Sequence, residues 1–461
     1  MTAADDSIHL DDQGGSRLGL LSAGELFKRY ATDPIRLVTI VLSTVVLGYG
    51  ARMDNHSPFT VPFLENLVGS SFTGVEVLVA LIFLLETLRR LVRRDFWLNR
   101  SPVTRPMIWV GIVLGISPFL RMIFEENRLR IPLEIIETPG VVLAFFLWLY
   151  VYRREDIQLM LWLVLIAGLF KSIEGVAIFL SVGLGWGLLT GWRDAMLMAV
   201  VLLAIFFSFA ITPGGSRAYQ NVRRFAFWLL PVAMFTYIGS TRRSFVLGAG
   251  AAIVVLVFFF RQNERRRLLV MALPLVGVLG IAATALIGSN QFVDRLGVIG
   301  DPTSEGSASY RLIEIYNISN MISERPIFGW PMGVSWRNYT LLEVENVSPV
   351  IPHNTYLYIT WRGGFLGLAI WIWVLISMLR MHFRTIRAAR TPYERFLAFW
   401  LTAATISVIV AGFTMNVGSD RLKWFYPFFM VMTSYLPGAW PARRVKALRA
   451  RSDASMVPEI P

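Results

Sequence analysis

The chain contains only four histidines, and one of them, His353, has a setting suited to proton transfer. It is preceded by Pro352 and followed by Asn354, at the point where a long polar loop meets an apolar run. An imidazole can accept a proton from an attacking hydroxyl near neutral pH. We interpret His353 as a general base or as the group that positions an acceptor; the alternative is a hydrogen-bonded histidine with a structural role.

The other three histidines have weaker settings. His9 belongs to a polar N-terminal tail, and His382 belongs to a basic stretch, so we expect both to be solvated. His56 stands close to Asp54 without further chemical groups nearby. Proton transfer is therefore assigned to His353 alone.

Arginines form the second group of candidates. Arg242 and Arg243 stand within Gly-Ser-Thr-Arg-Arg-Ser, which ends one apolar run and opens the next, and Arg311 stands near the start of a predicted helix. A guanidinium group binds phosphate or carboxylate with two parallel hydrogen bonds. These arginines are candidates for holding an anionic ligand; the alternative for each is a pair with lipid headgroups or a nearby glutamate.

Several kinds of chemistry are excluded by composition. The chain has no cysteine, which removes disulfides, thiol nucleophiles and cysteine-based metal centres. No acidic pair with the spacing of a two-carboxylate hydrolase is recognised, because the acidic residues of the long loop are scattered. These residues are Asp301, Glu305, Glu314, Glu343 and Glu345.

The elements that position these residues are membrane helices. Of 461 residues, 55% are hydrophobic and only 16% are charged, and the apolar residues form runs long enough to cross a bilayer. The fold class predicted is all-α, a polytopic membrane protein with about twelve transmembrane helices and one large outer loop. The expected spans are 34–50, 73–89, 107–123, 138–152, 157–181, 195–211, 225–240, 244–260, 267–288, 355–379, 396–415 and 424–440. Lys171 and Glu174 interrupt the fifth span, either as a functional pair or as an ion pair that satisfies itself.

Charge decides the expected orientation. The net charge is +13, and roughly 29 of the 44 basic residues fall on one side of this layout, which the positive-inside rule assigns to the cytoplasm. The basicity is thus a topology signal, and no nucleic-acid partner is predicted. The expected parts are a cytoplasmic tail with a short amphipathic helix (1–33), nine membrane helices (34–288), a periplasmic loop with active-site groups (289–354), three membrane helices (355–440) and a cytoplasmic C-terminal tail (441–461).

The loop 289–354 is the longest connection and lies on the outer side in this layout. Apolar residues at helical spacing predict a helix over 309–324, with Arg311 in its first turn, and Arg325-Pro326 closes it. A glycine-containing turn over 329–333 follows, and then Trp336. Long loops with their own structure often carry the functional groups of membrane enzymes.

Taken in order, these motifs resemble the bacterial O-antigen ligase and O-antigen polymerase superfamily. The resemblance rests on the Ser-Thr-Arg-Arg stretch before Ser244, on Ser309-Tyr310-Arg311, and on the Pro326…Gly329…Gly333 turn. It also rests on Pro352-His353-Asn354-Thr355-Tyr356-Leu357 and on Gly363-Gly364-Phe365-Leu366-Gly367. The specific residues lie between about 239 and 367, although the membrane layout extends the resemblance to the whole chain.

The resemblance implies a GT-C-like transferase in the inner membrane, with both termini cytoplasmic and a periplasmic active site. It implies an inverting transfer of a glycan, without a metal or a cofactor, from undecaprenyl diphosphate to a hydroxyl. That hydroxyl belongs either to lipid A-core (ligase) or to a growing glycan (polymerase). The catalytic residues would be His353 and Arg311, and the diphosphate would be held by Arg242, Arg243 and Arg311. Asn354, Trp336 and Tyr356 would be possible glycan contacts.

Two alternatives stay open within and outside this class. We favour the ligase over the O-antigen, capsule or exopolysaccharide polymerase because the layout has a single dominant outer loop. A flippase or transporter of lipid-linked glycans is the alternative of another class, but no matching half-repeat is found in the sequence. A purely structural scaffold would not explain why arginines are retained on the outer side.

Overall fold

The structure of the protein is a computed structural model, and it describes twelve parts of the chain at most of their positions. These are 28–49, 81–92, 102–113, 156–182, 192–211, 217–239, 243–270, 306–330, 334–339, 352–414, 425–436 and 438–439, with single gaps at several positions. The expected span 138–152, most of the spans at 73–89, 107–123 and 267–288, and both tails beyond these limits lie outside the described residues.

The described residues form helices and connecting turns, without strands. The principal helices are α2 (Pro34–Tyr49), α8 (Asp156–Val182), α9 (Trp192–Ala210), α10 (Arg217–Gly239), α11 (Arg243–Val257), α14 (Gly306–Glu324), α15 (Thr355–Ala388), α16 (Pro392–Ala411) and α17 (Phe425–Ser434). Three segments within them are long and apolar enough to cross a membrane: Asp156–Ala177, Thr355–Ala388 and Pro392–Ala411. The helical class is confirmed, whereas the number of twelve spans stays a prediction.

Most helices coincide with an expected span, but three differ clearly in length. Helix α10 begins at Arg217, eight residues before the expected start at 225. Helix α15 continues to Ala388, nine residues beyond the expected end at 379, because no helix-breaking residue intervenes. Helix α17 has ten residues instead of the expected seventeen, and ends three residues before Pro437. Within α8, Nζ of Lys171 lies 3.1 Å from Oε2 of Glu174. The two residues thus form the ion pair with each other that was one of the two alternatives.

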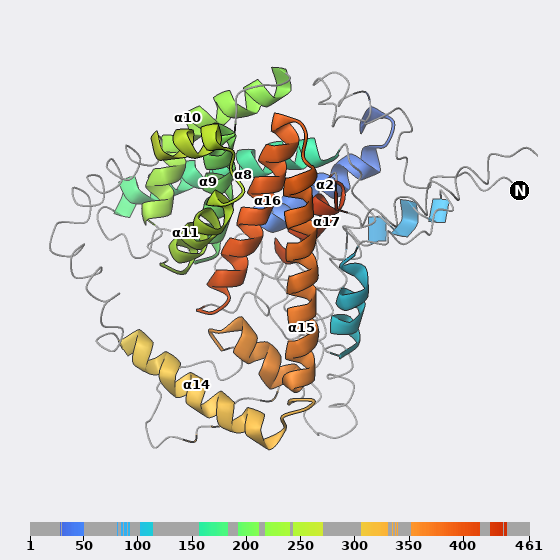
Figure 1. Cartoon of the computed structure of the whole chain (residues 1–461), viewed down its shortest axis with the longest axis vertical. Coiled ribbons are helices and arrows are strands. Elements are labelled where there is room, and N and C mark those ends of the chain that lie inside the picture. Colours follow the sequence, from blue (N-terminus) through green and yellow to red (C-terminus); the bar gives the residue numbers. More distant parts are fainter. Residues whose placement is uncertain are drawn as a thin grey trace, which may run out of the picture.

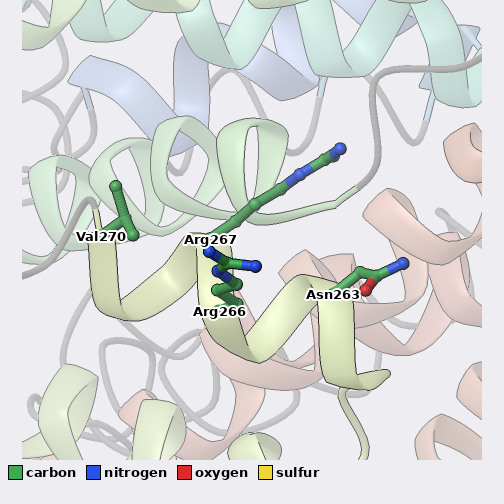
Figure 2. A pocket seen from close by; sticks show the side chains of 4 residues that line it. All are labelled: Asn263, Arg266, Arg267 and Val270. Carbon is green, nitrogen blue, oxygen red and sulfur yellow. The ribbon is translucent and has the colours of Figure 1, made fainter.

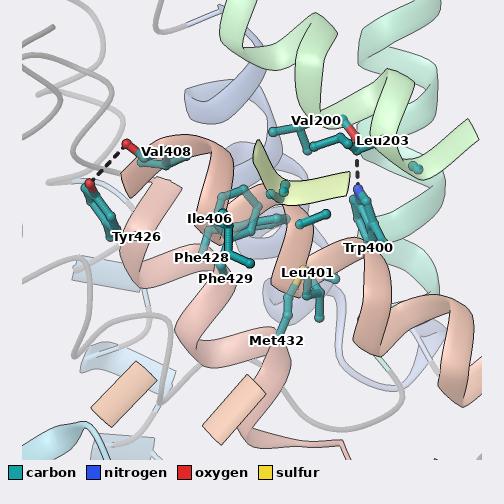
Figure 3. Close-up of a cluster of buried hydrophobic side chains, with 14 of the residues drawn as sticks. Val200, Leu203, Trp400, Leu401, Ile406, Val408, Tyr426, Phe428, Phe429 and Met432 are labelled. Atoms are coloured by element: carbon teal, nitrogen blue, oxygen red, sulfur yellow. Dashed lines mark hydrogen bonds between the residues drawn. The ribbon is translucent and has the colours of Figure 1, made fainter. Parts of the chain in front are cut away.

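Helix α16 is the centre of the molecule (Figure 1). Almost nine-tenths of its most apolar stretch is buried inside the protein. Trp400 donates from its indole nitrogen to the carbonyl of Val200 on α9, at 2.9 Å, and α17 contributes Phe428, Phe429 and Met432 to the same apolar cluster (Figure 3). A helix surrounded on all sides by others must be apolar all round, as α16 is.

The closest approach to α16 is made by α11. A side chain at Gly248 would begin 2.5 Å from the carbonyl oxygen of Ser407, so only glycine fits between the two backbones. At one end of this pair, Ser244 on α11 accepts a hydrogen bond of 2.6 Å from Thr414, just beyond α16. At the other end, Arg395 of α16 binds Glu264 through two nitrogens, at 2.6 and 3.0 Å. The pair is therefore fixed at both ends.

His382 is not solvated, contrary to the expectation from its basic neighbours. It lies on α15 and is fully buried against α16 and α17. Its Nε2 lies 2.8 Å from the hydroxyl of Thr405, and its Nδ1 lies 3.0 Å from the hydroxyl of Thr433. Since Thr433 donates its own proton to Phe429, it accepts from Nδ1–H, and Thr405 then donates to Nε2. His382 is thus a neutral bridge between three helices.

Helix α15 is broken near its start. Gly364 has φ +61°, a left-handed conformation, so the first turns of α15 bend away from its long axis toward α14 (Figure 1). The segment 326–330 fills the break and supplies its hydrogen bonds: Phe365 donates to Pro326 at 2.7 Å, and Trp330 donates to Trp361 at 2.7 Å. Gly329 also has a positive φ, +69°. We call this contact between 326–330 and the break in α15 the glycine joint.

Replacement of Gly364 by alanine is expected to destabilise the glycine joint. The new Cβ would overlap the backbone of Ile327, and the left-handed conformation adds a cost on the order of 1–3 kcal/mol. The melting temperature of the purified protein in detergent should fall by several degrees. As a control, Gly250→Ala on α11 places its Cβ in open space and should leave the melting temperature unchanged or slightly higher.

Candidate active site

His353 and Glu314 form a hydrogen-bonded pair between the loop and α14. The Nδ1 atom of His353 lies 3.0 Å from Oε2 of Glu314, and the other carboxylate oxygen accepts from the backbone N–H of His353. Two contacts from one carboxylate fix both the ring and the backbone of His353 in place. The sequence offered no defined partner for Glu314, and the structure supplies one.

The two members of the pair differ in exposure. The Glu314 side chain is 3% exposed, whereas the His353 side chain is 53% exposed. Burying a carboxylate without a hydrogen-bond donor costs free energy, so Glu314 favours the tautomer of His353 in which Nδ1 carries the proton. The lone pair of a neutral ring is then on Nε2. This arrangement is that of a general base held by a carboxylate.

Arg311 lies one turn before Glu314 on α14. The sequence predicted Arg311 in the first turn of this helix. Because α14 begins at Gly306, Arg311 lies in the second turn instead. Residues three apart on a helix have their Cβ atoms roughly 5–6 Å apart, on the same face. Arg311 is half-buried, and it lies on the face of α14 that also carries the buried Glu314 and Ile318. The helix therefore brings a cation close to the His353–Glu314 pair.

Arg243 is brought to the same end of the bundle. It is the first residue of α11, and the next residue, Ser244, is bonded to Thr414. The neighbour of Thr414, Phe413, accepts a hydrogen bond of 2.9 Å from the side chain of Asn354. A continuous set of contacts thus connects the start of α11 with the residue that follows His353.

Asn354 and Tyr356 are engaged with the protein itself. The side-chain oxygen of Asn354 caps α15 by accepting from the N–H groups of Tyr356 and Leu357, at 2.9 and 3.0 Å. The hydroxyl of Tyr356 donates to Ile409 on α16 at 2.8 Å, and its ring packs on Phe413, with 4.5 Å between the ring centroids. These contacts fix the start of α15 against the end of α16. Whether either residue also contacts a glycan stays a prediction.

Two of the predicted site residues, Arg242 and Trp336, lie outside the described residues. The nearby Trp330 is buried in the glycine joint, where its indole nitrogen donates to Met321 at 2.7 Å. Arg325 and Arg337 lie over its ring, 4.2 and 5.0 Å from the centroid. Trp330 therefore packs the loop against α14 and α15.

Glu314 is the functional residue that the sequence motifs missed. The available signal was its position three residues after Arg311, on the same face of a predicted helix. Its partner, however, is 39 residues away in the sequence. Only the packing of α14 against the start of α15 shows that this glutamate meets His353.

Comparison with known proteins agrees with the motifs. A family model described as O-antigen ligase matches residues 225–372, which include Arg243, Arg311, Glu314 and His353. The resemblance to the O-antigen ligase superfamily is thereby confirmed over these residues. The match supports a membrane enzyme of the ligase or polymerase kind and does not distinguish the two. No curated protein matches the chain in a sequence search.

Removal of the cap on α15 is expected to weaken the site. Asn354→Ala removes two bonds to the helix start and one to Phe413, and the loss of an N-cap typically costs about 1 kcal/mol. We expect a lower melting temperature and faster hydrogen exchange at the start of α15. Asn354→Asp keeps the cap but cannot donate to Phe413, so it should recover only part of the stability; full stability of the alanine variant would contradict this role.

Proposed function

We propose that the protein is a membrane glycosyltransferase that moves a glycan from undecaprenyl diphosphate to an acceptor hydroxyl at the periplasmic face. The single observation that carries the proposal is the His353–Glu314 pair, an exposed imidazole held by a buried carboxylate. It lies within the region that matches the O-antigen ligase family model. The preferred reaction is the ligase reaction, with lipid A-core as the acceptor.

In the proposed reaction, the acceptor hydroxyl loses its proton to Nε2 of His353 while its oxygen attacks the anomeric carbon of the donor sugar. The bond between that carbon and the diphosphate oxygen breaks, and the diphosphate leaves with the electron pair. Attack from the side opposite the leaving group inverts the anomeric centre. Glu314 stabilises the positive charge that forms on the ring and keeps Nε2 directed at the acceptor.

The arginines supply the charge that this leaving group requires. A lipid diphosphate carries at least two negative charges, and the interaction with guanidinium groups is strong where water is scarce. Arg311, beside the His353–Glu314 pair, and Arg243 or Arg242, at the start of α11, are proposed to hold the diphosphate. Asn354 and Tyr356 are proposed to position the site through their contacts with α16.

The distribution of charge supports the proposed orientation. The end of the bundle opposite His353 carries a large set of basic residues among those described. They include Arg223, Arg224, Arg261, Arg265, Arg266, Arg267, Arg384, Arg387 and Arg390. By the positive-inside rule that end faces the cytoplasm, so His353 faces the periplasm of a bacterial inner membrane.

His353→Ala and Arg311→Ala are each expected to reduce glycan transfer at least about a hundredfold, because each removes a group that acts on the reacting atoms. The measurement uses purified protein in detergent with an undecaprenyl-diphosphate-linked glycan and an acceptor. Arg337→Ala is the matched control, since this exposed arginine pairs with Glu324 and lies over the Trp330 ring but is assigned no role at the reacting atoms, and its transfer rate should be unchanged. Full transfer by both site variants, folded as judged by gel filtration, would refute the assigned roles.

The Glu314→Gln variant tests whether Glu314 positions the His353 ring for catalysis or only stabilises the fold. Glutamine can still accept a bond from the backbone of His353 but carries no charge, so kcat should fall roughly ten- to a hundredfold with little change in KM. Glu314→Asp, which keeps the charge on a shorter side chain, should recover part of the rate. Equal rates for the wild type and Glu314→Gln would show that the carboxylate only stabilises the fold.

A deletion strain distinguishes the two transferase reactions. Loss of a ligase should leave long glycan chains on undecaprenyl diphosphate, whereas loss of a polymerase should leave single repeat units. The lipid-linked intermediates can be separated by size after extraction. The transporter alternative is tested with purified protein in detergent, where there is no second compartment. Consumption of the donor there indicates an enzyme, because a transporter does not convert its substrate chemically.

A further inference from the structure

A second group of cations lies at the end of the bundle opposite His353. The helical segment 262–270 follows α11 and carries Asn263, Arg266, Arg267 and Val270, which line an open pocket of about 290 Å³. Figure 2 shows the two arginines between Asn263 and Val270 on this one segment. The proposed transfer reaction uses none of these residues.

Arg267 has a polar atom that needs a partner. Its Nη1 is buried from solvent, and no hydrogen-bond acceptor for it is found among the described residues. Buried guanidinium nitrogens are nearly always bonded, so this nitrogen is available to an acceptor from outside the described residues. The closest carboxylate in sequence, Glu264, is already bound by Arg395 through two nitrogens. The pocket therefore has an excess of positive charge.

The apolar residues next to these arginines indicate what the acceptor belongs to. Leu269 and Val270 follow directly, and they are 59% and 64% exposed. The order along the helix is thus amide, two guanidinium groups, and then outward apolar side chains. A phospholipid presents the same order, a phosphate at the surface followed by acyl chains, and an arginine at a helix end reaches the phosphate while its stem stays apolar.

We propose that Asn263, Arg266, Arg267 and Val270 form a binding site for the phosphate headgroup of an anionic phospholipid in the leaflet at this end of the bundle. The two guanidinium groups bind the phosphate, Asn263 adds a hydrogen bond, and Val270 contacts the acyl chain. The occupied site fixes the depth of this helix in the bilayer.

The test uses the full-length protein, purified from nanodiscs of phosphatidylglycerol and phosphatidylethanolamine, with retained lipid counted by native mass spectrometry. The double variant Arg266→Gln, Arg267→Gln should retain about tenfold less phosphatidylglycerol. The matched control, Arg224→Gln with Arg261→Gln, loses the same charge at the same end from exposed residues that do not line the pocket, and it should stay within about twofold of the wild type.

Three results would overturn the proposal. Equal losses in the two double variants would show that net charge, not this pocket, retains the lipid. No loss in either would show that the pocket holds no lipid. Displacement of the lipid by excess inorganic phosphate would show a site for a free anion. Arg266→Lys with Arg267→Lys keeps the charge and should retain more lipid than the glutamine variant, which separates binding from misfolding.

Discussion

The glycine joint is the constraint on which the candidate site depends. A continuous α15 would carry its first turns straight along the axis of the helix, away from α14. The left-handed Gly364 redirects those turns, and segment 326–330 satisfies the backbone groups that the break exposes. Since 326–330 directly follows α14, the same contact fixes where α14 lies. Both partners of the His353–Glu314 pair are thus positioned by one break in one helix.

The second principle is that several buried polar groups are paired across helices. Glu314 meets His353, Glu264 meets Arg395, and His382 bridges two threonines. Such contacts add specificity to an apolar bundle, because each one is satisfied in a single arrangement of the helices. What sets the His353–Glu314 pair apart is exposure: the other two are closed within the protein, whereas the imidazole of His353 is open on one side.

The sequence predicted much of this arrangement from local signals. The apolar runs gave the helices α8 to α11, α15 and α16 to within several residues at most ends, because length and hydropathy are local properties. The motifs around Arg311 and His353 indicated the same family whose model matches residues 225–372. The sequence was wrong about His382, since basic neighbours at 380, 384 and 387 suggested a loop, while the helix turned this residue inward.

By itself, the sequence determined the membrane-helical class, the apolar and basic ends of the helices, and which residue types carry chemistry. The tertiary structure decided which of them meet. Glu314 became the partner of His353, and the side chain of Asn354 was joined to Phe413, only through contacts between segments dozens of residues apart. The physical reason is that hydropathy and helix spacing are properties of neighbouring residues along the chain. The pairing of a carboxylate with an imidazole depends instead on how α14 packs against the break in α15, which involves both segments.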